Sequence, residues 1–250
     1  MKRIALMVAK LLYIVPYWFF RMVWLGSEKH YDEEKAAKLL RKMVTRIIKA
    51  GRVTVECYGL ENLPEQNGYI MFPNHEGLFD SLVFMQVHER PFSLISKKEV
   101  KDVILIKQVM RLMRALPMDR NDVRQSMKVI MQVTKEVKEG RNYLIFPEGT
   151  RAGVPNQMHP FKAGSFKSAT QARCPIVPVA LVDTYKAFDS GSAKPITVQI
   201  HFLEPLYYEE YQGKKTQEIA QDVQSRIAAA LREYAPEEDA GTILEPKEKE

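Results

Sequence analysis

The sequence predicts an α/β fold, in which a mixed sheet flanked by helices follows an N-terminal helical hairpin that associates with a membrane. From Arg52 onward, short β-rich runs alternate with helical patterns, as is typical of an α/β domain. Hydrophobic residues make up 46% of the 250, an ordinary fraction for a globular chain. We divide the chain into the hairpin (1–50), a main domain (51–235) and an acidic, lysine-containing tail (236–250) that we predict to be disordered.

The first predicted helix, Ile4–Leu25, is apolar and rich in aromatic residues, but two basic residues and Pro16 interrupt it. A helix that spans a membrane needs about 20 mostly apolar residues, whereas the charge-free run here is only Leu11–Phe20. We therefore predict insertion into the membrane interface and place a true span second. A signal peptide comes last, because no small-x-small cleavage site precedes Gly26.

The second predicted helix has apolar residues at helical spacing from Ala36 to Ile48 and basic residues on its other side, and Gly51 marks its end. Beside the aromatic segment, this basic amphipathic helix predicts a hairpin that lies on a membrane. The alternative is a helix that packs on the main domain with a solvated charged face.

Charge and cysteine content indicate where the protein works. Residues 1–50 carry 11 Lys/Arg and 4 Asp/Glu, whereas the other 200 carry 26 and 27, so the basic surplus belongs to the hairpin. This distribution favours an anionic membrane surface over nucleic acid as the partner. Cys57 and Cys174 form no disulfide framework and have no metal-ligand spacing, which indicates a reducing compartment. We expect a peripheral or monotopic protein on the cytoplasmic face of the cell membrane.

The elements of the main domain follow from composition and periodicity. Short runs rich in β-branched and aromatic residues predict strands at Val53–Tyr58, Tyr69–Phe72, Phe92–Ser96, Tyr143–Phe146, Ile176–Leu181 and Ile196–Phe202. Helical patterns predict helices at Leu78–Met85, Leu105–Arg114, Val123–Glu139, Gly164–Gln171 and Thr216–Tyr234.

The first candidate site follows the strand predicted at Tyr69–Phe72. His75 and Asp80 stand five positions apart, directly after Asn74. An imidazole next to a carboxylate suits a base that takes a proton from a hydroxyl, because the carboxylate fixes the ring tautomer and stabilises the imidazolium. We predict that His75 and Asp80 are catalytic, and Asn74 is a further candidate.

The second candidate site, Glu148-Gly149-Thr150-Arg151, follows another predicted strand, at the edge where open α/β sheets place ligands. Gly149 permits close approach of the backbone to a substrate. The guanidinium of Arg151 offers a planar set of donors that suits a phosphate monoester. Lys162 either adds positive potential for that phosphate or for an acidic partner, or is a solvated lysine at a helix start.

Four blocks stand in order along the chain: Asn74–Asp80, Leu116–Arg120, Phe146–Arg151 and Ile176–Leu181. This set resembles the glycerolipid acyltransferases, in particular the bacterial 1-acylglycerol-3-phosphate (lysophosphatidate) acyltransferases, over about residues 51–205. Gly77 departs from the family, which often has Ser there.

The resemblance implies that Arg120, Glu148, Gly149, Thr150 and Arg151 hold the glycerol phosphate. The implied reaction moves a fatty acyl group from an acyl-carrier-protein or coenzyme A thioester to the sn-2 hydroxyl of lysophosphatidate, with no cofactor and no metal.

Three alternatives stay open at this point. The same chemistry could act on another lysophospholipid or lipid acceptor. A metal hydrolase could use His75, Asp80 and Glu148 as ligands, although the closely spaced second histidine of many such sites is missing. A membrane-binding scaffold without activity is the third, and the complete candidate blocks argue against it.

Overall fold

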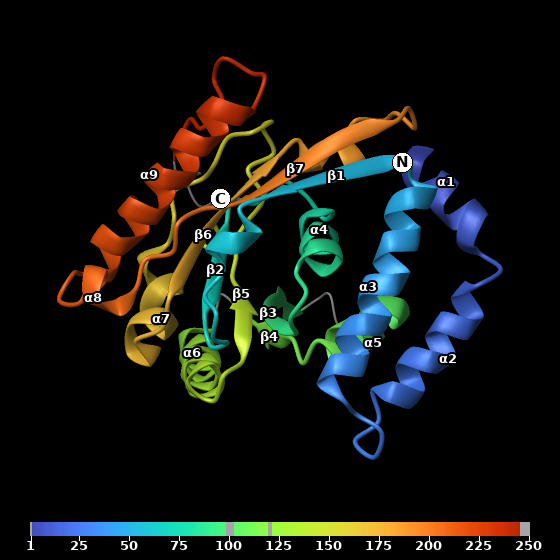
Figure 1. The fold of residues 1–250 in the computed structure, drawn as a ribbon, viewed down its shortest axis with the longest axis horizontal. Helices are drawn as coiled ribbons and strands as arrows, with labels where there is room; N and C mark the ends of the chain where they lie inside the picture. The colour runs from blue at the N-terminus through green and yellow to red at the C-terminus, as the bar shows by residue number, and fades with distance from the viewer. Residues whose placement is uncertain (1, 99–102, 120–121, 246–250) are drawn as a thin grey trace.

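The computed structural model describes residues 2–98, 103–119 and 122–245. Figure 1 shows a twisted sheet with helices on both faces, and with the N-terminal helices together on one side. The strands are β1 (Val53–Tyr58), β2 (Ile70–Pro73), β3 (Phe92–Lys97), β4 (Leu116–Met118), β5 (Asn142–Leu144), β6 (Ile176–Val182) and β7 (Ile196–Phe202). The α-helices are α1 (Lys2–Leu11), α2 (Val15–Leu25), α3 (Glu33–Ala50), α4 (Asp80–Val87), α5 (Ile104–Leu112), α6 (Val123–Lys138), α7 (Lys167–Ala172), α8 (Tyr208–Tyr211) and α9 (Thr216–Tyr234). Short 3-10 helices are η1 (Leu60–Asn62), η3 (Ala163–Phe166) and η4 (Thr184–Ala187).

The sheet has seven strands in the order β1-β7-β6-β2-β5-β3-β4. Strand β2 lies at its centre and pairs in parallel with β6 and β5. Strand β7 runs antiparallel to β6, and β1 pairs with it in parallel, so the sheet is mixed as predicted. Since β2 and β5 are parallel, the chain segments that leave their C-terminal ends emerge on one edge of the sheet.

Two apolar clusters cover the two faces of the sheet. Alternation along β2 divides its side chains between them, because successive residues of a strand point to opposite faces. Met71 joins the cluster that includes α3, α4 and the end of α5, whereas Ile70 and Phe72 join the cluster of α6, α7 and α9. Both faces of the central strand are therefore buried, which explains its continuous apolar sequence.

The predicted first helix is two helices, because the chain bends by 81° between α1 and α2. Pro16 stands in the first turn of α2, where it is tolerated because the N–H that it lacks would have no partner there. Within the described residues, neither helix alone has the length and hydropathy to cross a membrane, but the bent pair passes that test together.

The apolar face of α3 packs inside the protein and does not lie on a surface, which corrects the predicted second arm of the hairpin. Leu40, Met43 and Ile48 are buried, and α3 contacts α4 and β1. Residues 1–50 also share one apolar cluster with β1 and β2, so they are not a separate unit. The packing alternative holds for this helix because its apolar stripe meets the helices that cover the sheet.

The prediction of a disordered tail is wrong for its first ten residues, which the structure places against the main domain. Ala240 is buried, and Gly241 donates its N–H to the Asn156 carbonyl at 2.8 Å. Met158 N donates to the Thr242 carbonyl, and Leu244 N donates back to Met158. The tail is therefore held by backbone hydrogen bonds, which acidic composition does not reveal.

Candidate active site

Asn74 ties the loop after β2 to the neighbouring strand. Its side chain is fully buried, and its amide nitrogen donates to the Leu181 carbonyl at 2.9 Å. The Leu181 N–H donates to the Asn74 amide oxygen at 2.7 Å. This pair of hydrogen bonds fixes where the chain leaves β2, so Asn74 positions the next residue, His75.

His75 and Asp80 form the pair that their spacing predicts. The imidazole Nδ1 lies 2.7 Å from Asp80 Oδ2, and the ring packs against Phe146 with centroids 4.1 Å apart. An Nδ1–H that donates to the carboxylate leaves Nε2 with its lone pair. The His75 side chain is 21% exposed, whereas Asp80 is completely buried. The arrangement is that of a general base with its orienting carboxylate.

Asp80 is held by more donors than the sequence indicates. Its carboxylate accepts the backbone N–H groups of Glu76 at 2.9 Å and Gly77 at 3.0 Å. The hydroxyl of Thr184, in η4, lies 2.6 Å from Asp80 Oδ1. These donors fix the orientation of the carboxylate toward His75. Thr184 and Glu76 are the residues of this site that the motifs do not reveal.

Glu148 is buried, and backbone donors occupy both of its oxygens, which argues against its predicted contact with glycerol phosphate. Its two oxygens accept backbone N–H groups, from His75 at 2.6 Å and from His159 at 2.8 Å. Burial raises the pKa of Glu148 to about 8. Glu148 therefore joins the loop of His75 to the loop after β5, and it positions the histidine through the backbone.

Gly149 makes the tight turn that follows Glu148. Its φ is +73°, and a Cβ there would lie 2.7 Å from Lys162 Nζ. The ammonium group of Lys162 therefore lies against this turn, next to the predicted phosphate-binding block. The structure brings Lys162 to the site, although its side chain is largely exposed.

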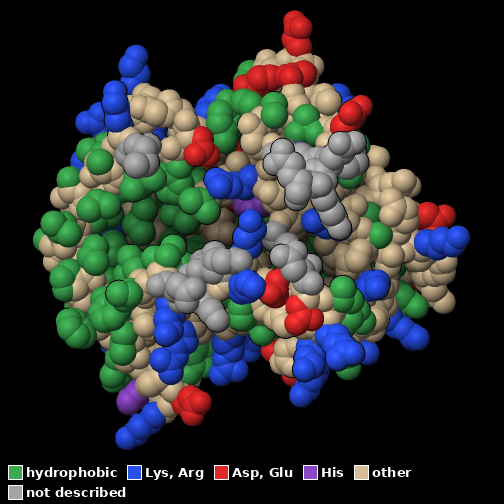
Figure 2. All heavy atoms as spheres, turned by 180° about the vertical axis from the view of Figure 1, so that it is seen from behind, with side chains coloured by type: hydrophobic (Ala, Val, Ile, Leu, Met, Phe, Trp, Pro, Cys, Tyr) green, Lys and Arg blue, Asp and Glu red, His purple; other side chains and the backbone are tan. Residues whose placement is uncertain are grey.

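An open cavity of about 370 Å³ lies beside the loop of His75. Its lining includes Thr150, Arg151 and Glu76, together with Tyr185 and Asp189 from the segment after β6. Thr150 and Arg151 are exposed, so their side chains are accessible to a ligand. In the space-filling view, Figure 2 shows a central hollow bordered by Lys and Arg side chains, next to a broad hydrophobic area.

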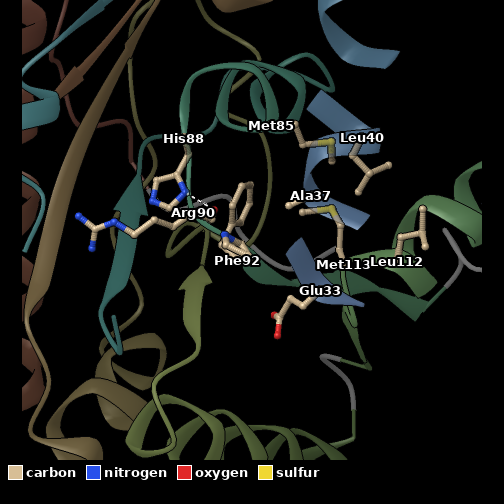
Figure 3. A pocket seen from close by; sticks show the side chains of 10 residues that line it. Glu33, Ala37, Leu40, Met85, His88, Arg90, Phe92, Leu112 and Met113 are labelled. Atoms are coloured by element: carbon tan, nitrogen blue, oxygen red, sulfur yellow. Dashed lines mark hydrogen bonds between the residues drawn. The ribbon is translucent and has the colours of Figure 1, made fainter. Parts of the chain in front are cut away.

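A second cavity lies between α3, the end of α4 and β3 (Figure 3). Its volume of about 30 Å³ holds on the order of one water molecule, which is too little for a lipid chain. His88 lines this cavity with its Nδ1 2.7 Å from the Arg90 carbonyl, and burial lowers its pKa to about 4. The larger cavity beside His75 is the better substrate site.

The geometry does not favour the metal-ligand set of the hydrolase alternative. His75 Nδ1 faces Asp80, and both oxygens of Glu148 accept backbone N–H groups, so the three groups do not point at one position. Among the residues that the structure describes, no three His, Cys, Asp or Glu side chains gather as a metal site would require. Arg120 lies outside the described residues, so its contact with phosphate stays a prediction.

The sequence that forms this fold and this site matches a known protein family. The model of the family described as Acyltransferase matches residues 54–182, just over half of the chain, from β1 to β6. The chain therefore belongs to the acyltransferase family.

Curated relatives name a reaction within that class. The chain is 28% identical over 177 residues to the chloroplastic 1-acyl-sn-glycerol-3-phosphate acyltransferase BAT2 of Brassica napus. The aligned region covers 69% of this chain and 49% of that protein. It is 27% identical over 194 residues to the 1-acyl-sn-glycerol-3-phosphate acyltransferase of Escherichia coli, over 76% of this chain and 79% of that protein. The chain thus spans about half the length of the Brassica relative.

A solved structure shares the fold. The crystal structure of the 1-acyl-sn-glycerophosphate (LPA) acyltransferase PlsC from Thermotoga maritima superposes with a TM-score of 0.72 at 22% identity. The superposition covers 93% of this chain and 95% of that one, so the shared fold extends over nearly the whole chain.

Proposed function

We propose that this protein transfers a fatty acyl group from a thioester of acyl carrier protein or coenzyme A to the sn-2 hydroxyl of lysophosphatidate. One observation carries the proposal: the His75–Asp80 pair lies in the loop whose Glu76 lines a cavity together with Arg151, in a chain of the acyltransferase family. The names of the relatives in Brassica and Escherichia coli support lysophosphatidate as the acceptor.

The chemistry needs one proton carrier and no covalent acyl-enzyme. His75 Nε2 takes the proton of the acceptor hydroxyl while the oxygen of that hydroxyl attacks the thioester carbonyl carbon. The tetrahedral intermediate collapses, the carbon–sulfur bond breaks, and the proton on His75 passes to the thiolate. Phosphatidate and the free thiol are the products. Asp80 stabilises the imidazolium through its 2.7 Å contact with Nδ1.

The cationic side chains beside the cavity are assigned to the acceptor phosphate. Arg151 provides the planar donor set, while Lys162 adds positive charge next to the Gly149 turn. Thr150 contributes a hydroxyl to the same lining. No cofactor or metal takes part in the proposed reaction.

The assay that tests the proposal is acyl transfer from a labelled acyl thioester to lysophosphatidate by the purified protein in detergent with EDTA. Phosphatidate formation in EDTA would support both the acceptor and the metal independence. If the folded protein forms none, the acceptor assignment fails, and a panel of other lysolipids then decides between a different acceptor and the scaffold alternative.

Arg151→Ala should raise KM for lysophosphatidate by roughly ten- to a hundredfold, since a charge-assisted hydrogen bond contributes about 1.5–3 kcal/mol. Steady-state kinetics with varied acceptor at saturating thioester measure it. Arg173→Ala is the matched control, because this arginine lies over the Tyr208 ring, outside the cavity lining. An unchanged KM in Arg151→Ala would remove this residue from the acceptor site.

The N-terminal helices provide the surface that we assign to a membrane on the cytoplasmic side. Figure 2 shows hydrophobic side chains gathered on one side of the molecule. The turn between α1 and α2 exposes Leu12 and Tyr13, and α2 exposes Phe20. Helix α5 packs against α2 and adds Ile104, which is also exposed. The acceptor lives in the bilayer and the thioester arrives from water, so this surface would hold the site at their boundary.

Substituting Leu12, Tyr13 and Phe20 together by Asn should weaken binding to anionic phospholipid vesicles by at least about a thousandfold, since burial of each large apolar side chain contributes about 1.5–3 kcal/mol. Vesicle sedimentation measures the change. Val123→Asn is the control, because Val123 is equally exposed but belongs to α6. Equal binding of the triple variant and the wild type would contradict the assigned surface.

A further inference from the structure

Two buried carboxyl groups share one hydroxyl beside the catalytic histidine. Glu76 is 4% exposed and Asp80 is 0% exposed. Thr184 Oγ1 lies 2.8 Å from Glu76 Oε2 and 2.6 Å from Asp80 Oδ1. A hydroxyl has one proton and can donate to only one of the two carboxyl groups. The other short contact therefore needs a proton on a carboxyl group.

The distribution of donors decides which carboxyl group carries that proton. Asp80 accepts the backbone N–H groups of Glu76 and Gly77 as well as His75 Nδ1, and such donors favour the charged form. Glu76 accepts the Asn156 N–H at 3.1 Å on Oε1 and the Tyr185 N–H at a longer 3.3 Å on Oε2. The Thr184 backbone N–H also donates to Glu76. Because its measured backbone contacts are longer than those of Asp80, Glu76 is the weaker site for a negative charge.

The surroundings of Glu76 also oppose a second negative charge. The titratable or charged groups that face it are His75 from its own loop, Asp80 from α4, Tyr185 from η4, and Arg151 and Asp189 from the cavity lining. The side-chain amide of Asn156 donates to both Asp183 and Glu237. Lys186 forms an ion pair with Asp183 at 2.6 Å. Arg151 is exposed to solvent and Lys186 is already paired, so within the part of the chain that the structure describes no buried cation compensates Glu76.

We infer that Glu76 is a protonated positioning residue, which donates its carboxyl proton to Thr184 Oγ1 while the Thr184 hydroxyl donates to Asp80 Oδ1. This chain of hydrogen bonds holds the Asp80 carboxylate toward His75 and leaves one negative charge under the imidazole. Burial and the nearby Asp80 raise the pKa of Glu76 to about 8, which agrees with the inference.

Ionisation of Glu76 would disturb the proposed acyl transfer, on which this consequence rests. A second carboxylate beside Asp80 would favour the imidazolium form of His75, which cannot accept a proton. It would also leave the Thr184 hydroxyl with two competing acceptors. The enzyme should therefore lose activity on the alkaline side as Glu76 loses its proton.

Glu76→Gln tests the inference, because an amide donates to Thr184 permanently and never ionises. At pH 7 its kcat should stay within about threefold of the wild type, since the hydrogen-bond chain is kept. On the alkaline side the wild type should decline with a midpoint near pH 8, and the decline of the variant should be smaller; a part should remain, because burial also raises the pKa of Glu148 to about 8 in both proteins. A folded Glu76→Gln that is inactive at every pH would show that the ionised form is needed and would overturn the inference.

Thr184 supplies the matched pair of variants. Thr184→Ser keeps the hydroxyl and should retain kcat within about threefold, whereas Thr184→Val removes the bridge and should lower kcat at least about tenfold. Equal activity of the two variants would contradict the proposed chain.

Two measurements that need no turnover separate this inference from the proposed reaction. Infrared difference spectra of the wild type minus Glu76→Gln at pH 7 should show the carbonyl stretch of a protonated carboxyl group. Because the folded chain keeps this proton while the unfolded chain loses it, the free energy of unfolding should fall between pH 4.5 and about 8, and Glu76→Gln should fall less. If lysophosphatidate is not acylated but the carbonyl stretch and the pH-dependent fall in unfolding free energy are both present, the proposed acceptor is wrong and the protonation of Glu76 is supported. The absence of both signals would refute the inference even in an active enzyme.

Discussion

His75→Ala is expected to lower kcat by about 10²–10⁴-fold while the protein stays folded, because a positioned general base contributes that much to a proton transfer. The His75 side chain is partly exposed, so its removal empties little of the core. Asp80 keeps its two backbone donors and the hydroxyl of Thr184 after the imidazole is gone. The loss should therefore appear in turnover and not in stability.

The measurement is acyl transfer to lysophosphatidate by wild type and variant at equal concentrations of folded protein, with circular dichroism as the check on folding. His201→Gln is the matched control, because this histidine stacks between Tyr58 and Tyr234 in β7, next to the edge strand β1. Appreciable acyl transfer by folded His75→Ala would contradict the assignment of His75 as the general base.

The sheet could be predicted because its strands are short apolar runs between clear breaks. Predicted and observed bounds coincide for Val53–Tyr58 and Ile196–Phe202, and the helix Thr216–Tyr234 also agrees at both ends. The motif residues were found for a related reason, since Asn74–Asp80 and Glu148–Arg151 follow the parallel strands β2 and β5 at the same edge of the sheet.

Strand β4 was not predicted from the sequence, and it shows where a local sequence pattern is insufficient. It has three residues, Leu116–Met118, with a proline in the middle, and proline is a signal against a strand. It forms because it pairs with β3 at the edge of the sheet, where the missing N–H costs little. Its existence depends on a partner far away in the chain, which a window of sequence does not contain.

The roles of Glu76, Glu148 and Thr184 depend on contacts between distant segments. Thr184 reaches Asp80 across 104 residues, and Glu148 reaches the His75 N–H across 73. The motif identified Glu148 as part of the site but assigned it to the ligand, because the sequence does not reveal that both its oxygens accept backbone donors. A residue type at the correct spacing therefore predicted the location of the site better than it predicted each role.

Truncation after Ala235 is expected to cost about 1.5–4.5 kcal/mol of unfolding free energy, since it removes three backbone hydrogen bonds worth about 0.5–1.5 kcal/mol each. Those bonds hold the tail to Asn156 and Met158, two residues that are fully buried. Asn156 N also donates to Glu76, so loosening of this loop should reach His75 and Asp80 and lower kcat as well.

Urea unfolding and acyl-transfer assays of the two truncated proteins measure these effects. Truncation after Glu245 is the control, because it keeps every described contact of the tail. A protein truncated after Ala235 that unfolds at the same urea concentration as this control would show that the docked tail contributes nothing. A loss of stability with unchanged kcat would instead separate the tail from the site, and would mean that Glu76 and Asp183 hold Asn156 in place without it.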